Sequence, residues 1–67
     1  MRVTDQRRGY GHKTVTIEGI APDRQVSDDL LIGFAMHAAG ENPSMLFGWS
    51  VSTYNDRTKA IVTLNTE

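Results

Sequence analysis

The segment between Ser27 and Gly40 constrains the fold of this chain most, because it carries a full set of helix signals. Ser27 is a favourable N-cap residue, and Asp28 and Asp29 place negative charge in the first turn, where the helix dipole favours it. Gly40 stands where a left-handed residue commonly ends a helix. The sequence therefore predicts one helix over residues 28–39.

Alternating segments on both sides of this helix predict strands. Residues 12–18 are rich in β-branched side chains and alternate apolar with polar residues at a period of two, as half-buried strands do. Residues 45–54 and 59–64 predict two further strands joined by a short turn. This hairpin places Trp49 opposite Leu64 and collects the apolar pairs on one face.

Together these segments predict an α+β domain, a β-α-β-β two-layer sandwich with one helix packed on a small, mainly antiparallel sheet. Residues 19–25 predict the loop before the helix. Residues 3–6 are a candidate extra N-terminal edge strand, which turns back through residues 7–11 and gives the order ββαββ. The predicted organisation is a basic flexible arm or edge strand over 1–11 and a single α+β domain over 12–67.

The predicted helix is apolar on two sides. Ile32 and Met36 lie outside the expected core stripe, one turn apart, with Gly33 beside them. A helix that is apolar all round is normally covered all round, and a helix-interior Gly, which costs about 1 kcal/mol relative to Ala, often has a packing reason. We therefore expect self-association through this back face, although single exposed apolar side chains are also common. The expected core stripe is Leu30, Leu31, Phe34, Ala35 and Ala38, facing Val15, Ile17, Phe47, Trp49, Val51, Val62 and Leu64 on the sheet.

Length and composition limit the classes of protein and of site. The chain has 67 residues, and a domain of this size buries only about 60% of the surface that its unfolded chain exposes, so assembly would add needed burial. It has no Cys, which excludes disulfides and thiolate metal sites and favours a cytoplasmic location. No stretch approaches the roughly 18 apolar residues of a membrane span, and the N-terminus has no signal-peptide core, so no membrane partner is expected.

Charge is unevenly distributed along the chain. Residues 1–13 hold four Lys and Arg against one Asp, a net +3, whereas residues 14–67 hold three against seven acidic residues, a net −4. The acidic body argues against a broad phosphate-binding face. The arm combines cations, an aromatic ring and glycines, which is typical of segments that contact an anionic partner such as nucleic acid, although basic tails also occur as solvated termini. Its candidate contact residues are Arg7, Arg8, Tyr10 and Lys13.

Chemistry-bearing motifs are weak, which predicts that the protein is not an enzyme and has no cofactor or metal. His37 lies in the last helical turn, where its residue at i−4 is Gly33, so no second ligand or base stands at helical spacing. The serines have no neighbouring base or nucleophile elbow, and no glycine-rich phosphate loop occurs.

The β-α-β-β order, the short length and a Trp early in the strand after the helix resemble the arrangement in dodecins, small flavin-binding proteins that assemble as hollow dodecamers. The resemblance implies that Trp49 stacks a planar aromatic ligand, with loose local matches at residues 17–19 and 22–23. This chain departs from the family in a shorter helix, a longer connection at residues 40–44 and a tighter last hairpin. The residues alone indicate that Trp49 belongs to the core.

We therefore expect a small noncatalytic protein-interaction module of the adaptor or stoichiometric-inhibitor type, a class that includes proteins of phage and mobile elements. It is expected to form a homodimer or larger oligomer through Ile32, Gly33 and Met36 and to bind another protein. One alternative is a nucleic-acid-binding protein that uses the N-terminal arm. The other is an oligomeric binder of a planar, flavin-like ligand at Trp49.

Overall fold

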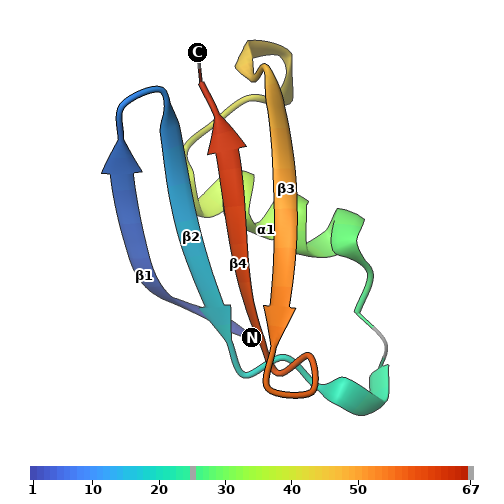
Figure 1. The fold of residues 1–67 in the computed structure, drawn as a ribbon. Helices are drawn as coiled ribbons and strands as arrows, with labels where there is room; N and C mark the ends of the chain where they lie inside the picture. The colour runs from blue at the N-terminus through green and yellow to red at the C-terminus, as the bar shows by residue number, and fades with distance from the viewer. Residues whose placement is uncertain (25, 67) are drawn as a thin grey trace.

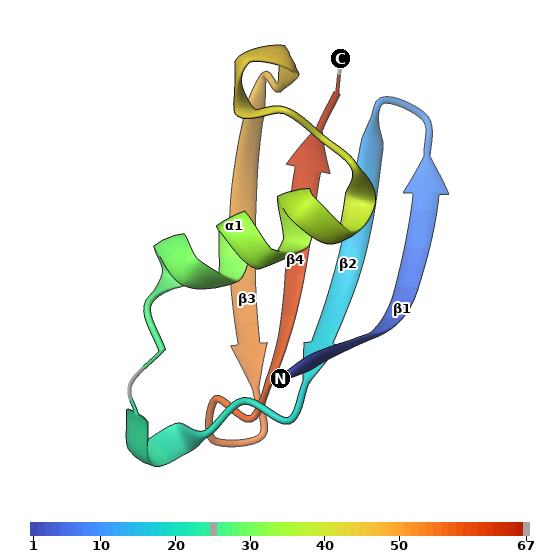
Figure 2. The same cartoon turned by 180° about the vertical axis from the view of Figure 1, so that it is seen from behind.

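The predicted α+β class is confirmed in a computed structural model, which describes residues 1–24 and 26–66 apart from the side chain of Pro22. Gln25, at the end of the predicted loop, and Glu67 lie outside the described residues. A four-stranded antiparallel sheet of order β1-β2-β4-β3 carries helix α1 on one face (Figures 1 and 2). The elements are β1 Arg2–Gly9, β2 His12–Glu18, the short 3-10 turn η1 Pro22–Arg24, α1 Asp28–Ala39, the 3-10 turn η2 Pro43–Met45, β3 Gly48–Tyr54 and β4 Lys59–Asn65.

The N-terminal segment is an edge strand that pairs with β2 from Arg2 to Gly9. Its register shifts between Val3 and Asp5, where the strand bulges. The strand continues beyond the predicted residues 3–6 because the hairpin closes in a tighter turn than expected. Gly11 adopts a φ of 79° in that turn, a conformation that favours glycine.

The last hairpin has the predicted register, with Trp49 opposite Leu64 and Val51 opposite Val62. Its turn holds three consecutive left-handed residues, from Asn55 to Arg57. The strand before it is shorter than predicted, because residues 43–45 form η2 instead of extending β3. Asn42 caps this turn by accepting a hydrogen bond from the Ser44 N–H at 3.1 Å.

The helix has both predicted ends. The Ser27 hydroxyl accepts a hydrogen bond from the Leu30 N–H at 3.2 Å. Gly40 is left-handed, with a φ of 69°, and its N–H donates to the His37 carbonyl. The local signals were therefore sufficient to place the helix within the chain.

The orientation of the helix about its own axis differs from the prediction. Met36 is only 7% exposed and belongs to the buried core, and Ile32 is half-buried against it, whereas Leu30 is 55% exposed. The pattern offered two apolar sides, and helical periodicity cannot decide which of them the sheet covers. The core is Val15, Ile17, Ile20, Leu31, Ala35, Met36, Ala60, Val62 and Leu64.

This orientation removes the physical basis of the predicted apolar back face. The outward residues of α1 include Asp29, Gly33 and His37, a mixed polar surface. A Cβ on Gly33 would meet no atom of the described chain within 4 Å, so no close backbone approach explains this glycine within one copy.

Among the described residues, no helix has the length and apolar character needed to cross a membrane.

Candidate functional site

The sheet has two edge strands, and β1 is the charged one. Four of its eight residues carry charge, and a bulge interrupts its ladder with β2. Charged side chains and bulges are the usual features by which edge strands resist pairing with another chain. The charged residues are Arg2, Asp5, Arg7 and Arg8.

The opposite edge, β3, carries none of these features. No charged residue occurs between Asn42 and Asn55, and the register of β3 with β4 is continuous over residues 48–54. An edge strand without charge or bulge presents its unpaired backbone groups to any extended chain that approaches. The β3 edge is therefore the side of the sheet that is open to pairing.

Large apolar side chains are exposed where the chain enters β3. Met45 is 70% exposed, Phe47 is 78% exposed and Trp49 is 46% exposed. We call these three residues together with strand β3 the apolar edge. Three large apolar side chains exposed within five residues form a local patch rather than the scattered exposure that is ordinary in proteins.

The backbone that carries this patch is held in place. The Phe47 N–H donates to the carbonyl of Asn65 at 2.8 Å, and the η2 turn before it is closed by a 2.8 Å hydrogen bond from the Met45 N–H to the Asn42 carbonyl. Asn42 also accepts from the Ser44 hydroxyl at 3.0 Å. The side chains of the patch are therefore presented from ordered backbone, which lowers the entropy cost of binding.

The two faces of β3 differ. Trp49 pairs across the ladder with a buried residue of β4 and lies on the α1 side, together with Val51 and Thr53. The intervening residues face the uncovered side. Helix α1 begins beyond β3 in both views, so its first turn, with exposed Leu30, projects past this edge of the sheet (Figures 1 and 2).

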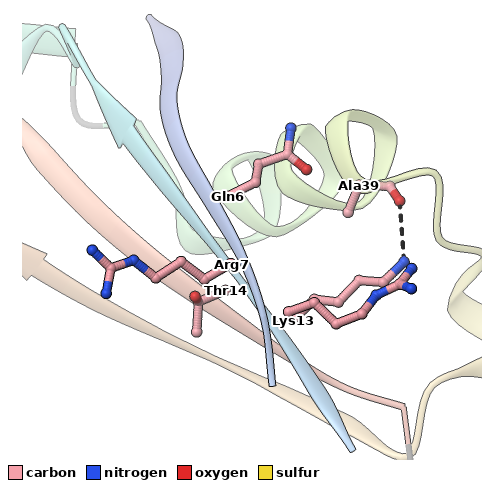
Figure 3. A pocket seen from close by; sticks show the side chains of 6 residues that line it. Gln6, Arg7, Lys13, Thr14 and Ala39 are labelled. Atoms are coloured by element: carbon pink, nitrogen blue, oxygen red, sulfur yellow. Dashed lines mark hydrogen bonds between the residues drawn. The ribbon is translucent and has the colours of Figure 1, made fainter. Parts of the chain in front are cut away.

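The predicted arm residues lie at the far edge, around the β1–β2 hairpin. Arg7 and Lys13 point away from each other, Lys13 toward the end of α1 (Figure 3). Arg7 pairs with the Asp5 carboxylate at 2.9 Å, and Lys13 pairs with Glu41 at 2.5 Å. Two of the predicted contact cations are therefore paired with carboxylates of the same chain.

The hairpin tip retains one exposed recognition group. Tyr10 is 95% exposed at the turn, and Arg8 is exposed nearby. Arg8 lies opposite Lys13 in the ladder, so these two share the α1 side while Arg7 occupies the other face. The arm is thus divided between two faces of the sheet instead of forming one continuous basic stripe.

The structure does not bring the predicted assembly residues together on an exposed surface. Met36 is in the core, Ile32 is half-buried and only Gly33 is exposed. Phe47, predicted to lie in the core, is instead exposed. The charge-free run from residue 42 to 55 was the sequence signal that could have identified the apolar edge.

Metal and ligand sites have little support in the geometry. Across residues 1–24 and 26–66, no group of three or more His, Asp or Glu side chains could hold a metal ion. Trp49 is half covered on the α1 side of the sheet, neither a fully buried core residue nor a free stacking platform. Flavin binding at Trp49 stays a prediction.

Comparison with protein-family models, curated proteins and solved structures found no match to this chain. The likeness to dodecins gains no support from these comparisons, and β1 adds a strand to the β-α-β-β arrangement on which it was based. Any functional conclusion therefore depends on the chemistry of the surface itself.

Proposed function

We propose that this chain is a protein–protein interaction module that binds its partner along the apolar edge. The observation that carries this proposal is the exposure of Met45, Phe47 and Trp49 beside an uncharged edge strand. Contiguous exposed apolar patches on small domains commonly mark interaction sites. The proposal keeps the expected class of function and moves its surface from the helix to the sheet edge.

The energetics of such a surface favour a protein partner. Buried aromatic side chains dominate the binding energy of many interfaces, and each one that acts as a hot spot contributes about 2 kcal/mol or more. Phe47 and Trp49 are aromatic residues of this kind, and the ordered backbone beneath Phe47 reduces the ordering cost. Two such aromatic side chains near one edge favour a protein as the partner.

The expected mode of binding is strand addition. An extended segment that pairs with β3 gains main-chain hydrogen bonds, and alternate side chains of that segment fall on the two faces of the sheet. On the α1 side they meet Trp49 and Val51. The first turn of α1, with exposed Leu30, projects past the same edge of the sheet (Figure 2). A partner segment with apolar residues at alternate positions fits this arrangement.

Capture of partner proteins from a lysate of the native host tests the proposal. Wild type and Phe47→Asp are immobilised at equal density, and Tyr10→Asp serves as the matched control because Tyr10 is an exposed aromatic residue at the opposite edge. We expect the same specific proteins on wild type and Tyr10→Asp and their loss on Phe47→Asp. Equal retention by all three would contradict the proposal, provided that circular dichroism shows the variants folded.

A further inference from the structure

We infer that the segment that pairs with β3 is basic: an extended stretch of another protein with apolar side chains at alternate positions and a Lys or Arg on the side that faces α1. This inference rests on the proposed function, because it names the chemistry of the partner for the same surface. The feature that carries it is the first turn of α1, which projects past the β3 edge on the α1 side of the sheet (Figure 2).

Asp28 lies on the side of α1 that the sheet covers further along the helix. Leu31 and Ala35 follow it on the same side of the helix, and they are 1% and 0% exposed. The side chain of Asp28 is 62% exposed, because the helix begins beyond β3, the last strand at this edge (Figure 2). A strand added beside β3 would therefore place its α1-side residues next to Asp28.

The first turn of α1 carries more negative charge than its ion pair balances. Asp28 and Asp29 are both exposed. One guanidinium nitrogen of Arg57 lies 3.4 Å from the Asp28 carboxylate and also donates to the Val26 carbonyl at 3.1 Å. Two carboxylates thus stand against one guanidinium group, and the remaining negative charge lies beside the uncharged strand β3.

This charge decides among the partners that the edge could accept. An uncharged or acidic segment would remove water from Asp28 without supplying a new counter-charge, and desolvating an unpaired carboxylate is costly. A second copy of this chain would bring the same carboxylates to the shared face, which opposes self-pairing. A Lys or Arg of the partner supplies the opposite charge, so electrostatic complementarity favours a basic segment.

The α1 side of β3 also suits a long cationic side chain. Trp49 and Val51 lie on this side, and Trp49 is 46% exposed. The methylene stem of a Lys or Arg packs on such apolar surface while its charged end reaches a carboxylate, and a cation over an indole ring gains a further attraction. On the other side of the sheet, Ser50 and Ser52 are exposed hydroxyl residues, which match small polar side chains of the segment.

Selection from a displayed library of random linear peptides tests the inference. Wild type, Phe47→Asp and Asp28→Lys are immobilised at equal density, and the retained peptides are sequenced. We expect wild type to retain peptides that Phe47→Asp does not, with apolar residues at alternate positions and Lys or Arg enriched at one fixed place among them. Asp28→Lys should replace that enrichment by Asp or Glu, because the charge that it presents is reversed.

A single selected peptide then gives the size of the charge effect by fluorescence anisotropy. Replacing its enriched Lys or Arg by Glu should weaken binding to wild type about tenfold or more. Asp28→Asn should weaken binding of the unchanged peptide about fivefold. Asp5→Asn removes the same charge at the far edge of the sheet and should leave the affinity unchanged. Circular dichroism checks that each variant is folded, and equal losses in Asp28→Asn and Asp5→Asn would overturn the inference.

The other outcomes separate the inference from the proposed function. Peptides that depend on Phe47 but carry no basic residue at a fixed place overturn the inference and leave the proposed function standing, and so does a basic enrichment that Asp28→Lys leaves unchanged. A wild-type dimer in sedimentation velocity that Phe47→Asp dissociates would show that a second copy occupies the edge, which also overturns the inference. If Phe47→Asp retains the same peptides as wild type, both fail.

Discussion

The two edges of the sheet, β1 and β3, belong to one layer but differ in composition. Four of the eight residues of β1 are charged and the strand bulges near its start, whereas none of the seven residues of β3 is charged and its ladder is continuous. An added strand would have to desolvate the charges of β1 but would cover mostly apolar and hydroxyl groups on β3. The β3 edge is therefore the one at which an added strand has the lower desolvation cost.

A second difference lies in how each edge is tied to the rest of the fold. The β1–β2 hairpin is anchored to the end of α1 by Lys13, which pairs with Glu41 and also lies 3.5 Å from the Ala39 carbonyl. The side chains of β3 carry no charge and form no such ion pair, and the Phe47 N–H donates to the Asn65 carbonyl. The β1–β2 hairpin is therefore tied to α1 by a charged contact, whereas large apolar side chains stay exposed beside β3.

The largest expected effect comes from removing the charges of β1. In the triple variant Asp5→Thr, Arg7→Thr, Arg8→Thr, both edges are uncharged apart from Arg2. We expect assemblies larger than the wild-type species in sedimentation velocity, because both edges then accept strands. An unchanged size distribution would contradict the protective role of these charges.

The next effect concerns the anchor of the β1–β2 hairpin. The side chains of Lys13 and Glu41 are 21% and 16% exposed, so Glu41→Gln leaves a largely buried ammonium without its carboxylate. We expect a loss of about 1 kcal/mol in the free energy of unfolding, measured by urea denaturation. Asp28→Asn, which breaks the more exposed pair with Arg57, is the control and should cost less than about 0.5 kcal/mol. Equal losses in the free energy of unfolding would show that the Lys13–Glu41 pair stabilises the fold no more than the exposed pair does.

A smaller effect tests whether the helix, rather than an edge, carries association. Gly33→Ala adds a Cβ into open space, so we expect a gain of about 0.5–1 kcal/mol in stability from helix propensity alone. Sedimentation velocity should show the same species for this variant as for wild type. Thermal denaturation and sedimentation measure the two quantities, and weaker association in this variant would return the interface to the helix surface around Ile32.

The smallest effect is expected for nucleic acid at the hairpin tip. Since Arg7 and Lys13 are paired with carboxylates, a duplex or a single-stranded oligonucleotide should bind weakly and without the steep salt dependence of multiple phosphate contacts. Fluorescence anisotropy across a salt series measures this. Tight, salt-sensitive binding that Arg8→Ala abolishes would identify the β1 edge as a second functional surface.

Much of the fold was predictable from local patterns. Ser27 and Gly40 mark the ends of α1, and alternation of side chains placed Trp49 opposite Leu64, because capping and strand register depend on nearby residues. The full length of β1 was less predictable, since its charged sequence has little apolar alternation. Its extended conformation depends on pairing with β2. The surface was predicted least well, as Phe47 shows.

The order of the elements, their ends and the pairing of the last hairpin follow from residue types alone, because backbone conformation and side-chain period act over a few positions. Two questions needed the packed molecule: which of two apolar sides of α1 meets the sheet, and which strands lie at the edges. Met36 and Phe47 are both apolar, yet one is in the core and the other is in solvent. Burial depends on where the layers meet in space, and the spacing of residues along the chain does not contain that information.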